Sequence, residues 1–314
     1  MRFRKQIRCC KLPELFGNLT TFTTPLFFLT DHFSKLKVYK MTINCKGNLI
    51  DLSSPKVMGI LNITPDSFYE GSRNTTPDSL LNRAEKMLKE GAAFLDIGGM
   101  STRPGAIDIS ADEELKRVIP AVELILKHFP ETLISIDTFR AEVALQSIEA
   151  GAAIINDISA GNLDEDMMGV IAKYQVPYIM MHMKGTPQNM KDLNKYEDLT
   201  QEVLFYFSEK IKAARQLGIN DIILDPGFGF SKNVSQNFEL LSNLELFKNL
   251  ELPLLVGLSR KSTIYKTLGL GPEEALNGTT VLNTIAITKG AHILRVHDVK
   301  EAMEVVKLTS QLKN

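Results

Sequence analysis

Eight short apolar runs recur along the chain, and each run stops at polar or glycine residues that precede a segment with helical spacing. Continuous apolar runs are typical of parallel strands that are buried on both faces. Eight strand–helix units predict a (β/α)8 barrel, also called a TIM barrel, whose chemistry lies where the strands end. The predicted strands are 57–61, 94–97, 133–136, 152–155, 178–181, 222–224, 254–256 and 293–296.

The segments between the runs repeat apolar residues at helical spacing. In the first segment, positions 80, 81, 84, 87 and 88 fall on one helical face, and Gly91 follows as a helix-ending glycine. A flavodoxin-like open sheet also alternates strands and helices, but it usually has five or six units, so eight units favour closure into a barrel. The predicted helices lie near 80–88, 113–128, 141–149, 165–174, 199–217, 238–243, 279–288 and 299–312.

The length of 314 residues suits one barrel with an additional segment. We predict an α/β barrel domain over residues 41–314, because the segment from Met41 reads as a short hairpin that leads into the first strand. Residues 1–40 form an N-terminal extension, which we expect to be disordered or not translated, with Met41 as the true start. An acid-poor, Arg-containing start is also typical of an organellar transit peptide, and this alternative stays open.

Charge is distributed unevenly between these two parts of the chain. Residues 1–40 hold eight Lys or Arg and two acidic residues, whereas the remainder holds 28 basic and 35 acidic residues, a net charge of −7. An acidic body argues against a nucleic-acid partner, and no apolar run is long enough for a membrane span. Three cysteines without metal-ligand spacing indicate a reducing compartment, so we expect a cytoplasmic protein.

Three of the runs end at residues that could form hydrogen bonds with the edge of a heterocycle. Asp137 and Asp225 follow the third and sixth runs, and Asn156 follows the fourth. Carboxylates only accept hydrogen bonds, whereas an amide donates and accepts, so the three side chains suit a ring with adjacent N–H donors. A carboxylate alone more commonly caps the next helix, and no close cluster of Asp, Glu and His supports a metal site built by the protein alone.

Cationic side chains follow other runs. Arg295 and His297 share one face of the last strand, because a single residue separates them. Lys261 lies in a basic loop before a helix start, and a glycine-rich loop carries Thr102 and Arg103. We therefore expect an anionic side of the barrel mouth that reads a ring and a cationic side that holds phosphates. Such a site suits substitution with departure of diphosphate.

Three further polar positions have simpler structural explanations. Arg260 precedes Lys261 and could pair with a surface acid, so we assign more weight to Lys261. His182 lies between two methionines and is most simply a histidine packed under the mouth. Asn62 ends the first run before a Thr-Pro-Asp-Ser sequence, and by itself it could serve only to form that turn.

At these residues the chain resembles the dihydropteroate synthases, the folate-pathway enzymes that sulfonamides target. Each motif is weak alone, but the ordered set is specific and covers about residues 42–312. The matching segments are VMGILNITPDSF at 57–68, STRPG at 101–105, IDT at 136–138, NDI at 156–158, DPGFGF at 225–230, SRKS at 259–262 and RVHDV at 295–299. The resemblance implies condensation of (7,8-dihydropterin-6-yl)methyl diphosphate with 4-aminobenzoate, which gives 7,8-dihydropteroate and diphosphate.

The resemblance also implies roles for individual residues and a homodimer. The pterin would be held by Asp137, Asn156, Asp225 and Lys261. The phosphates would be bound by Thr102, Arg103, Arg295 and His297, and Mg²⁺ would be coordinated by Asn62 together with the diphosphate. The 4-aminobenzoate would lie near Phe230 and Lys261 under two loops, which contain Thr64, Pro65, Asp66, Ser67 and Phe68 and, in the second loop, Ser101 and Pro104. The implied catalytic residues are Asp137, Asp225, Lys261, Arg295 and His297.

One position departs from the family pattern. The family usually has Glu immediately before the Ser-Thr-Arg sequence of the second loop, and Met100 stands there. A thioether carries no charge and accepts no strong hydrogen bond, so we expect altered loop positioning or 4-aminobenzoate binding rather than lost activity. Two alternatives remain open. One is a pterin-binding methyltransferase domain, which needs no diphosphate-binding cations, and the other is a pterin-binding protein that has lost turnover.

Overall fold

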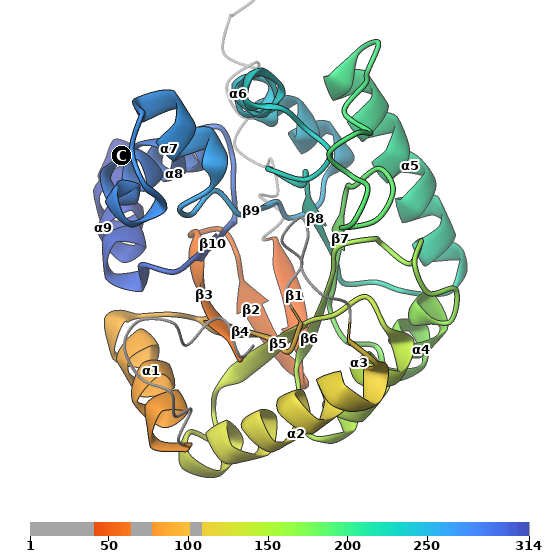
Figure 1. Ribbon diagram of the computed structural model, residues 1–314. Helices are drawn as coiled ribbons and strands as arrows, with labels where there is room; N and C mark the ends of the chain where they lie inside the picture. The colour runs from red at the N-terminus through yellow and green to blue at the C-terminus, as the bar shows by residue number, and fades with distance from the viewer. Residues whose placement is uncertain (1–40, 64–76, 101–108, 314) are drawn as a thin grey trace, which may run out of the picture. The chain divides into compact units, whose positions relative to one another are not determined.

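The computed structural model describes residues 41–63, 77–100 and 109–313. In this part of the chain, eight parallel strands curl into a barrel with helices around it (Figure 1), which confirms the predicted fold. The strands are β3 (Lys56–Asn62), β4 (Phe94–Gly98), β5 (Leu133–Asp137), β6 (Ile154–Asp157), β7 (Tyr178–Met181), β8 (Ile222–Asp225), β9 (Leu255–Val256) and β10 (Ile293–Val296). The predictions for residues 1–40 lie outside the described residues.

The barrel is closed by a short contact between the two end strands of the sheet, β8 and β9. The order of strands in the sheet is β8-β7-β6-β5-β4-β3-β10-β9, and each neighbouring pair is parallel. The two ends of this order meet through a parallel bridge between Leu224 and Leu254. The backbone N–H of Leu224 also donates to the Pro253 carbonyl at 2.8 Å. Because β9 has only two residues, closure rests on few backbone hydrogen bonds.

The helices follow the strands as the spacing predicted, with two differences. The sixth predicted helix begins at Val234 rather than near residue 238, because Asn233 and Gln236 form a capping box at its start. The helix start expected after the basic loop gives a short helix that ends at Gly269, in the left-handed conformation. The helices are α1 (Pro77–Glu90), α2 (Ala111–His128), α3 (Ala141–Glu149), α4 (Met167–Tyr174), α5 (Leu199–Gln216), α6 (Val234–Ser242), α7 (Ser262–Leu268), α8 (Leu276–Thr288) and α9 (Val299–Ser310), with short 3-10 helices at Leu244–Leu250, Pro272–Glu274 and Gln311–Lys313.

The barrel interior has two layers of opposite polarity, because alternate residues of a strand point to the same side. The lower layer, near the amino ends of the strands, is apolar and consists of Met58, Phe94, Ile154, Ile179, Ile223, Leu255 and Ile293. The upper layer, near the carboxyl ends, is polar and consists of Asp96, Asp137, Asn156, Asp225 and Arg295. Four of these five polar residues follow a lower-layer residue by two positions in the same strand. The upper layer therefore faces the barrel mouth.

A β-hairpin covers the lower layer, as the sequence predicted. Its strands are β1 (Thr42–Cys45) and β2 (Asn48–Asp51), which pair antiparallel. Ile43, Cys45 and the following Leu52 are buried in one cluster with the lower-layer side chains. Fully burying one such apolar side chain contributes about 1.5–3 kcal/mol, so this end of the barrel serves stability.

The outward faces of the strands pack against the surrounding helices in a second, larger apolar cluster. Within the described residues, no helix is both long enough and apolar enough to cross a membrane.

Candidate active site

The strand ends bring the upper-layer side chains together. Pairing of neighbouring strands sets Asp137 of β5 beside Asn156 of β6 and also beside Gly98 of β4. Asp225 ends β8, where it pairs with Met181 of β7. All of these positions are buried. Polar groups drawn from different strands thus form one wall of the barrel mouth, as expected for an active site in this fold.

Arg295 lies among the carboxylates rather than on a separate cationic side. Its Nε donates to Asp96 Oδ2 at 2.6 Å, and its Nη2 donates to Asp137 Oδ2 at 2.6 Å. The predicted division of the mouth into an anionic and a cationic side therefore does not hold for Arg295. Buried carboxylates require a nearby cation, and β10 is separated from β4 by only one strand.

Asp96 is a site residue that the sequence prediction missed. It is fully buried on β4, and Asn156 Nδ2 donates to its Oδ2 at 3.1 Å. The sequence prediction places binding residues only where apolar runs end, and Asp96 lies inside the run 94–97. A charged residue inside a buried strand, two positions after Phe94, was the available signal.

Two carboxylate oxygens in the upper layer have no hydrogen-bond partner among the described residues. Within the described part of the chain, Asp96 Oδ1 and Asp137 Oδ1 are buried and accept no hydrogen bond. Buried polar atoms are satisfied in the great majority of cases, so such acceptors suggest that a ligand supplies the donors. Adjacent N–H groups on a flat ring would meet this requirement.

Burial shifts the acidity of these groups. The pKa of Asp137 is raised to about 7 by burial, which outweighs the opposing effect of Arg295. Burial also raises the pKa of Asp225, although Lys261 opposes this shift. Burial disfavours the charged guanidinium of Arg295 as well, but Asp96 and Asp137 outweigh it and hold the Arg295 pKa above its usual value. Arg295 therefore stays charged while Asp137 titrates near neutral pH.

Lys261 lies against the turn that follows β8, within Gly227–Phe230. Its Nζ donates to the Phe228 carbonyl and lies 4.7 Å from the centre of the Phe230 ring. A Cβ atom on Gly229 would come within 3.0 Å of the Lys261 side chain, so glycine permits this close approach. Burial lowers the pKa of Lys261 to about 8, and Asp225 opposes the shift. The structure thus brings Phe230 and Lys261 together, as predicted.

The two remaining basic positions of this region are held by hydrogen bonds. Arg260 makes two contacts of 2.9 Å with the carboxylate of Asp298, which confirms its predicted pairing with an acid. His297 Nδ1 lies 3.0 Å from Ser259 Oγ, which also accepts the His297 backbone N–H at 3.1 Å. Arg260 therefore fixes the backbone next to Lys261, and Ser259 fixes His297.

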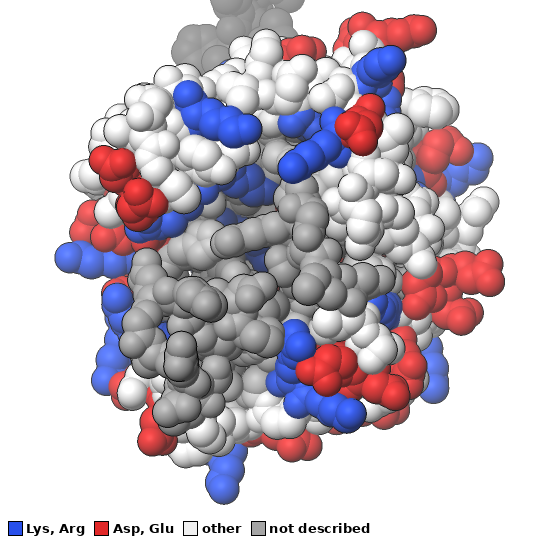
Figure 2. Space-filling model, in the orientation of Figure 1, with Lys and Arg blue, Asp and Glu red and all other residues white. Residues whose placement is uncertain are grey.

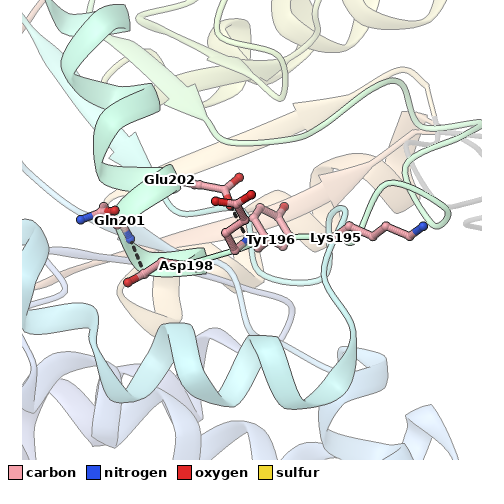
Figure 3. Close-up of a pocket in the computed structure, with 6 residues that line it drawn as sticks. Lys195, Tyr196, Asp198, Gln201 and Glu202 are labelled. Carbon is pink, nitrogen blue, oxygen red and sulfur yellow. Dashed lines mark hydrogen bonds between the residues drawn. The ribbon is translucent and has the colours of Figure 1, made fainter.

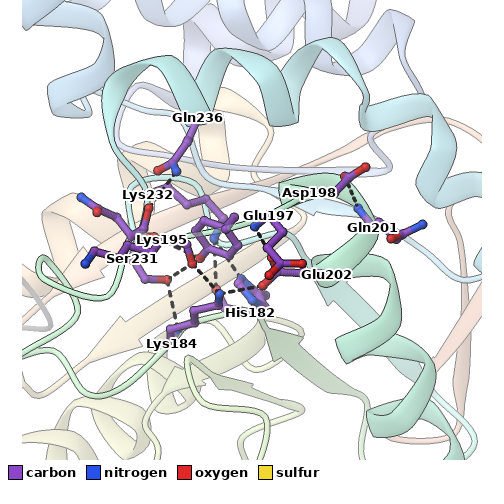
Figure 4. A network of polar contacts seen from close by, with 12 residues as sticks. His182, Lys184, Lys195, Glu197, Asp198, Gln201, Glu202, Ser231, Lys232 and Gln236 are labelled. Atoms are coloured by element: carbon purple, nitrogen blue, oxygen red, sulfur yellow. Dashed lines mark hydrogen bonds and ion pairs between the residues drawn. The ribbon is translucent and has the colours of Figure 1, made fainter.

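His182 is packed under the mouth, as predicted. It is buried, and its ring meets Tyr206 edge-on at a centroid distance of 4.9 Å. Its Nδ1 lies 3.0 Å from Nζ of Lys232, a buried lysine that the sequence prediction did not consider (Figure 4). Lys232 follows β8 by seven residues and His182 follows β7 directly, so nothing in the sequence indicated their contact.

A hollow of about 610 Å³ lies at the start of α5 (Figure 3), and no residue of the upper layer lines it. Its lining consists of Lys195, Tyr196, Glu197, Asp198, Gln201 and Glu202. The Asp198 side chain caps α5 by accepting from the Gln201 backbone N–H at 2.9 Å. Since none of the predicted site residues lines this hollow, its size does not make it the candidate site.

Charged side chains of both signs are visible on the face shown in Figure 2. Several Lys and Arg side chains lie above and below the grey atoms at the centre, and some of them adjoin Asp or Glu side chains.

The described side chains do not provide enough ligands to hold a metal ion by themselves, so a substrate would have to supply the other ligands. No group of three or more His, Cys, Asp and Glu in the described residues could hold a metal ion. The half-buried Asn62 lies close to Gly98, where an added Cβ atom would come within 3.4 Å of Asn62 Oδ1. Mg²⁺ is commonly held by one or two protein oxygens together with substrate phosphates, and this single amide oxygen fits that arrangement.

Met100 is buried at the end of the described part of the second loop. Its Sδ accepts from Arg140 Nη1 at 3.5 Å, and Arg140 also pairs with the buried Glu114 of α2. The carboxylate that partners Arg140 therefore comes from a helix. The remaining predicted loop residues lie outside the described residues, namely Thr64, Pro65, Asp66, Ser67, Phe68, Ser101, Thr102, Arg103 and Pro104.

Comparisons with known proteins agree with this geometry. A family model described as pterin binding enzyme matches residues 58–297. Dihydropteroate synthase of Escherichia coli strain K12 is 46% identical over 270 residues, which are 85% of this chain and 95% of that protein. A crystal structure of Yersinia pestis dihydropteroate synthase with a sulfonamide drug complex has a TM-score of 0.83 and 42% identity, and the match covers 87% of this chain and 99% of that chain. Xanthomonas albilineans dihydropteroate synthase in complex with 7,8-dihydropteroate has a TM-score of 0.77 and 34% identity, with 87% and 98% covered.

Proposed function

The chain belongs to the dihydropteroate synthase family of pterin-binding enzymes, and we propose that its upper layer and Lys261 carry out the family's reaction. The protein is a transferase of folate synthesis. It joins (7,8-dihydropterin-6-yl)methyl diphosphate to 4-aminobenzoate and releases diphosphate. The observation that carries the assignment of the site is the pair of unpartnered carboxylate oxygens, Asp96 Oδ1 and Asp137 Oδ1, in a buried wall beside Arg295.

The pterin ring would bind against the upper layer. Asp96, Asp137 and Asp225 provide acceptors for its ring N–H and amino groups, and Asn156 can both donate and accept. Asn156 Nδ2 already donates to Asp96 at 3.1 Å, which orients its carbonyl oxygen. A flat ring that satisfies the two unpartnered oxygens would stabilise charges that are otherwise costly to bury.

The diphosphate would lie at the cationic groups above the ring. Arg295 uses Nε and Nη2 for the carboxylates, and among the described contacts its Nη1 donates to no protein group. We assign Arg295 and His297, together with Thr102 and Arg103, to the phosphate oxygens. Asn62 would hold Mg²⁺ with the diphosphate, and the ion would supply charge neutralisation of the leaving group.

The chemistry needs no covalent enzyme intermediate. The C–O bond between the pterin methylene and the diphosphate breaks, and Arg295 and His297 stabilise the negative charge that grows on the leaving group. The carboxylate of Asp137 stabilises the positive charge that develops on the ring. The amine of 4-aminobenzoate then forms the new C–N bond and loses one proton. Exclusion of water protects the cation from hydrolysis.

The 4-aminobenzoate would lie beside Phe230 and Lys261. The half-buried Lys261 ammonium lies 4.7 Å from the Phe230 ring centre, so a negative charge and an aromatic ring can both be accommodated there. Since Lys261 also faces Asp225, it connects this pocket to the ring-binding wall.

We propose a homodimer formed through the face of α7, α8 and α9. Large apolar side chains are exposed on these helices, with exposed fractions of 53% for Leu268, 50% for Val281 and 72% for Leu308. The three helices are neighbours in the fold, and exposed apolar residues on neighbouring helices favour a protein interface. We also place the protein in the cytoplasm, because its cysteine usage suits a reducing compartment and the described cysteine, Cys45, is free and buried.

The test is direct assay of purified protein with Mg²⁺, the pterin diphosphate and 4-aminobenzoate. We expect release of diphosphate and formation of dihydropteroate in equal amounts. Pterin binding without diphosphate release would contradict the enzyme assignment. Release that survives Asp225→Ala undiminished would contradict the assignment of the site.

A further inference from the structure

Lys232 and His182 form a buried pair beneath the turn Gly227–Phe230 (Figure 4). Only 8% of Lys232 and 2% of His182 is exposed. Lys232 Nζ lies 3.0 Å from His182 Nδ1, from the Gly227 carbonyl and from the Phe230 carbonyl. The ammonium group thus has three acceptors at 3.0 Å, two of which belong to the turn, and the His182 carbonyl lies farther away at 3.5 Å.

The protonation of this pair is set by its surroundings. Burial, together with the charges of Lys232 and Lys184, lowers the pKa of His182 to about 2. His182 is therefore neutral, and the contact with an ammonium requires its proton to lie on Nε2 and Nδ1 to accept. Burial also lowers the pKa of Lys232 to about 7, opposed by Asp225 and assisted by Lys261 and Lys184.

The turn leaves little room for another arrangement. Gly227 has a φ of 73°, and an added Cβ atom would come within 2.0 Å of the His182 carbonyl oxygen. Its backbone N–H donates to Asp225 Oδ1 at 2.8 Å. Ser231, the next residue after the turn, has a φ of 46°, a left-handed conformation that is uncommon for residues other than glycine. The backbone therefore depends on its surrounding contacts to keep this shape.

The outer side of the same segment is held by a second group of contacts. Ser231 Oγ accepts the Lys184 backbone N–H at 3.0 Å, and the Ser231 carbonyl accepts Tyr196 O–H at 3.0 Å. The Lys184 side chain instead contacts Glu202 at 2.7 Å and lies 3.7 Å from the Tyr196 ring centre. Lys184 and Lys232 are thus neighbouring lysines, but only the Lys232 ammonium bonds the turn.

We propose that Lys232 and His182 are positioning residues, which hold the turn Gly227–Phe230 so that Phe230 and Lys261 keep their places in the active site. The link to Lys261 is the hydrogen bond that its Nζ donates to the Phe228 carbonyl. The link to Phe230 is its own carbonyl, which Lys232 binds. This inference rests on the proposed function for its kinetic consequence, but the effect on the turn can be measured without turnover.

The kinetic test compares four variants with the unchanged protein. Lys232→Met removes the ammonium, and we expect kcat/KM for 4-aminobenzoate to fall on the order of 10²-fold, with both a raised KM and a lowered kcat. His182→Leu should lower it about tenfold, whereas His182→Asn should stay within about threefold, because the amide oxygen can replace Nδ1 as acceptor. Lys184→Met is the matched control, and it should leave both constants within about twofold.

Hydrogen exchange of the backbone amides in Gly227–Ser231 provides the readout that does not depend on activity. We expect faster exchange in Lys232→Met and His182→Leu, and near-normal exchange in His182→Asn and Lys184→Met. Failure of the unchanged protein to release diphosphate would overturn the proposed function and leave the exchange prediction testable. Unchanged kinetics and exchange in folded Lys232→Met, or an equal loss in Lys184→Met, would overturn this inference. If Lys232→Met does not fold, the contrast between His182→Leu and His182→Asn decides it.

Discussion

The same strands supply both layers of the barrel interior, yet the layers differ in whether the protein itself provides partners for their side chains. In β10, Ile293 is fully buried in the apolar lower layer, and Arg295, two positions later, makes ion pairs with two carboxylates in the upper layer. The lower layer is complete within the chain, since the hairpin side chains fill its open end. In the part of the chain that the structure describes, the upper layer retains two unpartnered carboxylate oxygens. The same strand thus stabilises the fold at its amino end and presents polar groups for ligand binding at its carboxyl end.

The largest effect should come from removing the cation of the upper layer. Arg295→Met leaves the buried Asp96 and Asp137 without their partner and removes a stabilising charge for the departing diphosphate. We expect kcat to fall by about 10²–10³-fold. Steady-state measurement of diphosphate release checks this, with thermal unfolding as the control for folding. An active Arg295→Met enzyme would remove the functional distinction between the two layers.

The matching change in the lower layer is Ile293→Ala. Removal of a buried Ile side chain should lower the free energy of unfolding by about 2–5 kcal/mol, because the hairpin can fill the cavity only in part. Once the protein is folded, kcat and KM should stay within about twofold of the original values. Denaturant unfolding and steady-state kinetics on the same preparation measure both quantities. A selective loss of kcat without loss of stability would contradict the comparison.

Acid should act on the upper end of the barrel, where the titratable groups lie. His182 has a folded pKa of about 2 against an ordinary value of 6.5, so the unfolded chain binds its proton more readily. The stability that His182 contributes is complete above pH 6.5 and falls as the pH drops below it. Between pH 7 and pH 5 the loss should be about 2 kcal/mol.

Comparison with His182→Asn isolates this contribution, because other groups such as Asp137 titrate in both proteins. Denaturant unfolding should show that, between pH 7 and pH 5, the unchanged protein loses about 2 kcal/mol more of its free energy of unfolding than His182→Asn does. Equal losses in the two proteins would mean that His182 is protonated in the folded state without cost.

The last expected effect is in the pH dependence of turnover. The pKa of Asp137 is raised to about 7 and that of Lys261 is lowered to about 8. With Asp137 acting as the carboxylate and Lys261 as the ammonium, kcat/KM should rise as the pH approaches 7 and fall above 8, by about tenfold per unit on each limb. The rising limb should disappear in Asp137→Asn. A flat profile between pH 5 and pH 9 would contradict the assigned charge states.

The sequence predicted the barrel and much of the site for a common reason. The eight apolar runs and the glycines that follow several helices are local signals, and they place Asp137, Asn156 and Asp225 at strand ends without knowledge of the pairing. Asp96 was missed because it lies inside a run, where only the pairing of strands shows that it faces Arg295.

Long-range contacts account for the remaining differences. The contact between His182 and Lys232 joins residues 50 positions apart and depends on how two loops fold onto each other. The ion pairs of Arg295 join residues from three strands, so residue types alone could not show that this cation lies among the acids. The predicted role of Met100 stays a prediction, although its contact with Arg140 gives it a defined neighbour.

The alternation of the strands also constrains how this protein can evolve. Loops around the barrel can change in length without altering which side chains face inward. Deletion of one residue within β5, however, would exchange the faces of Ile136 and Asp137, so that the aliphatic side chain points into the barrel and the carboxylate meets the helices. Insertions or deletions of a single residue within a strand should therefore be selected against. In a library of length variants, we expect the tolerated changes to lie in the loops.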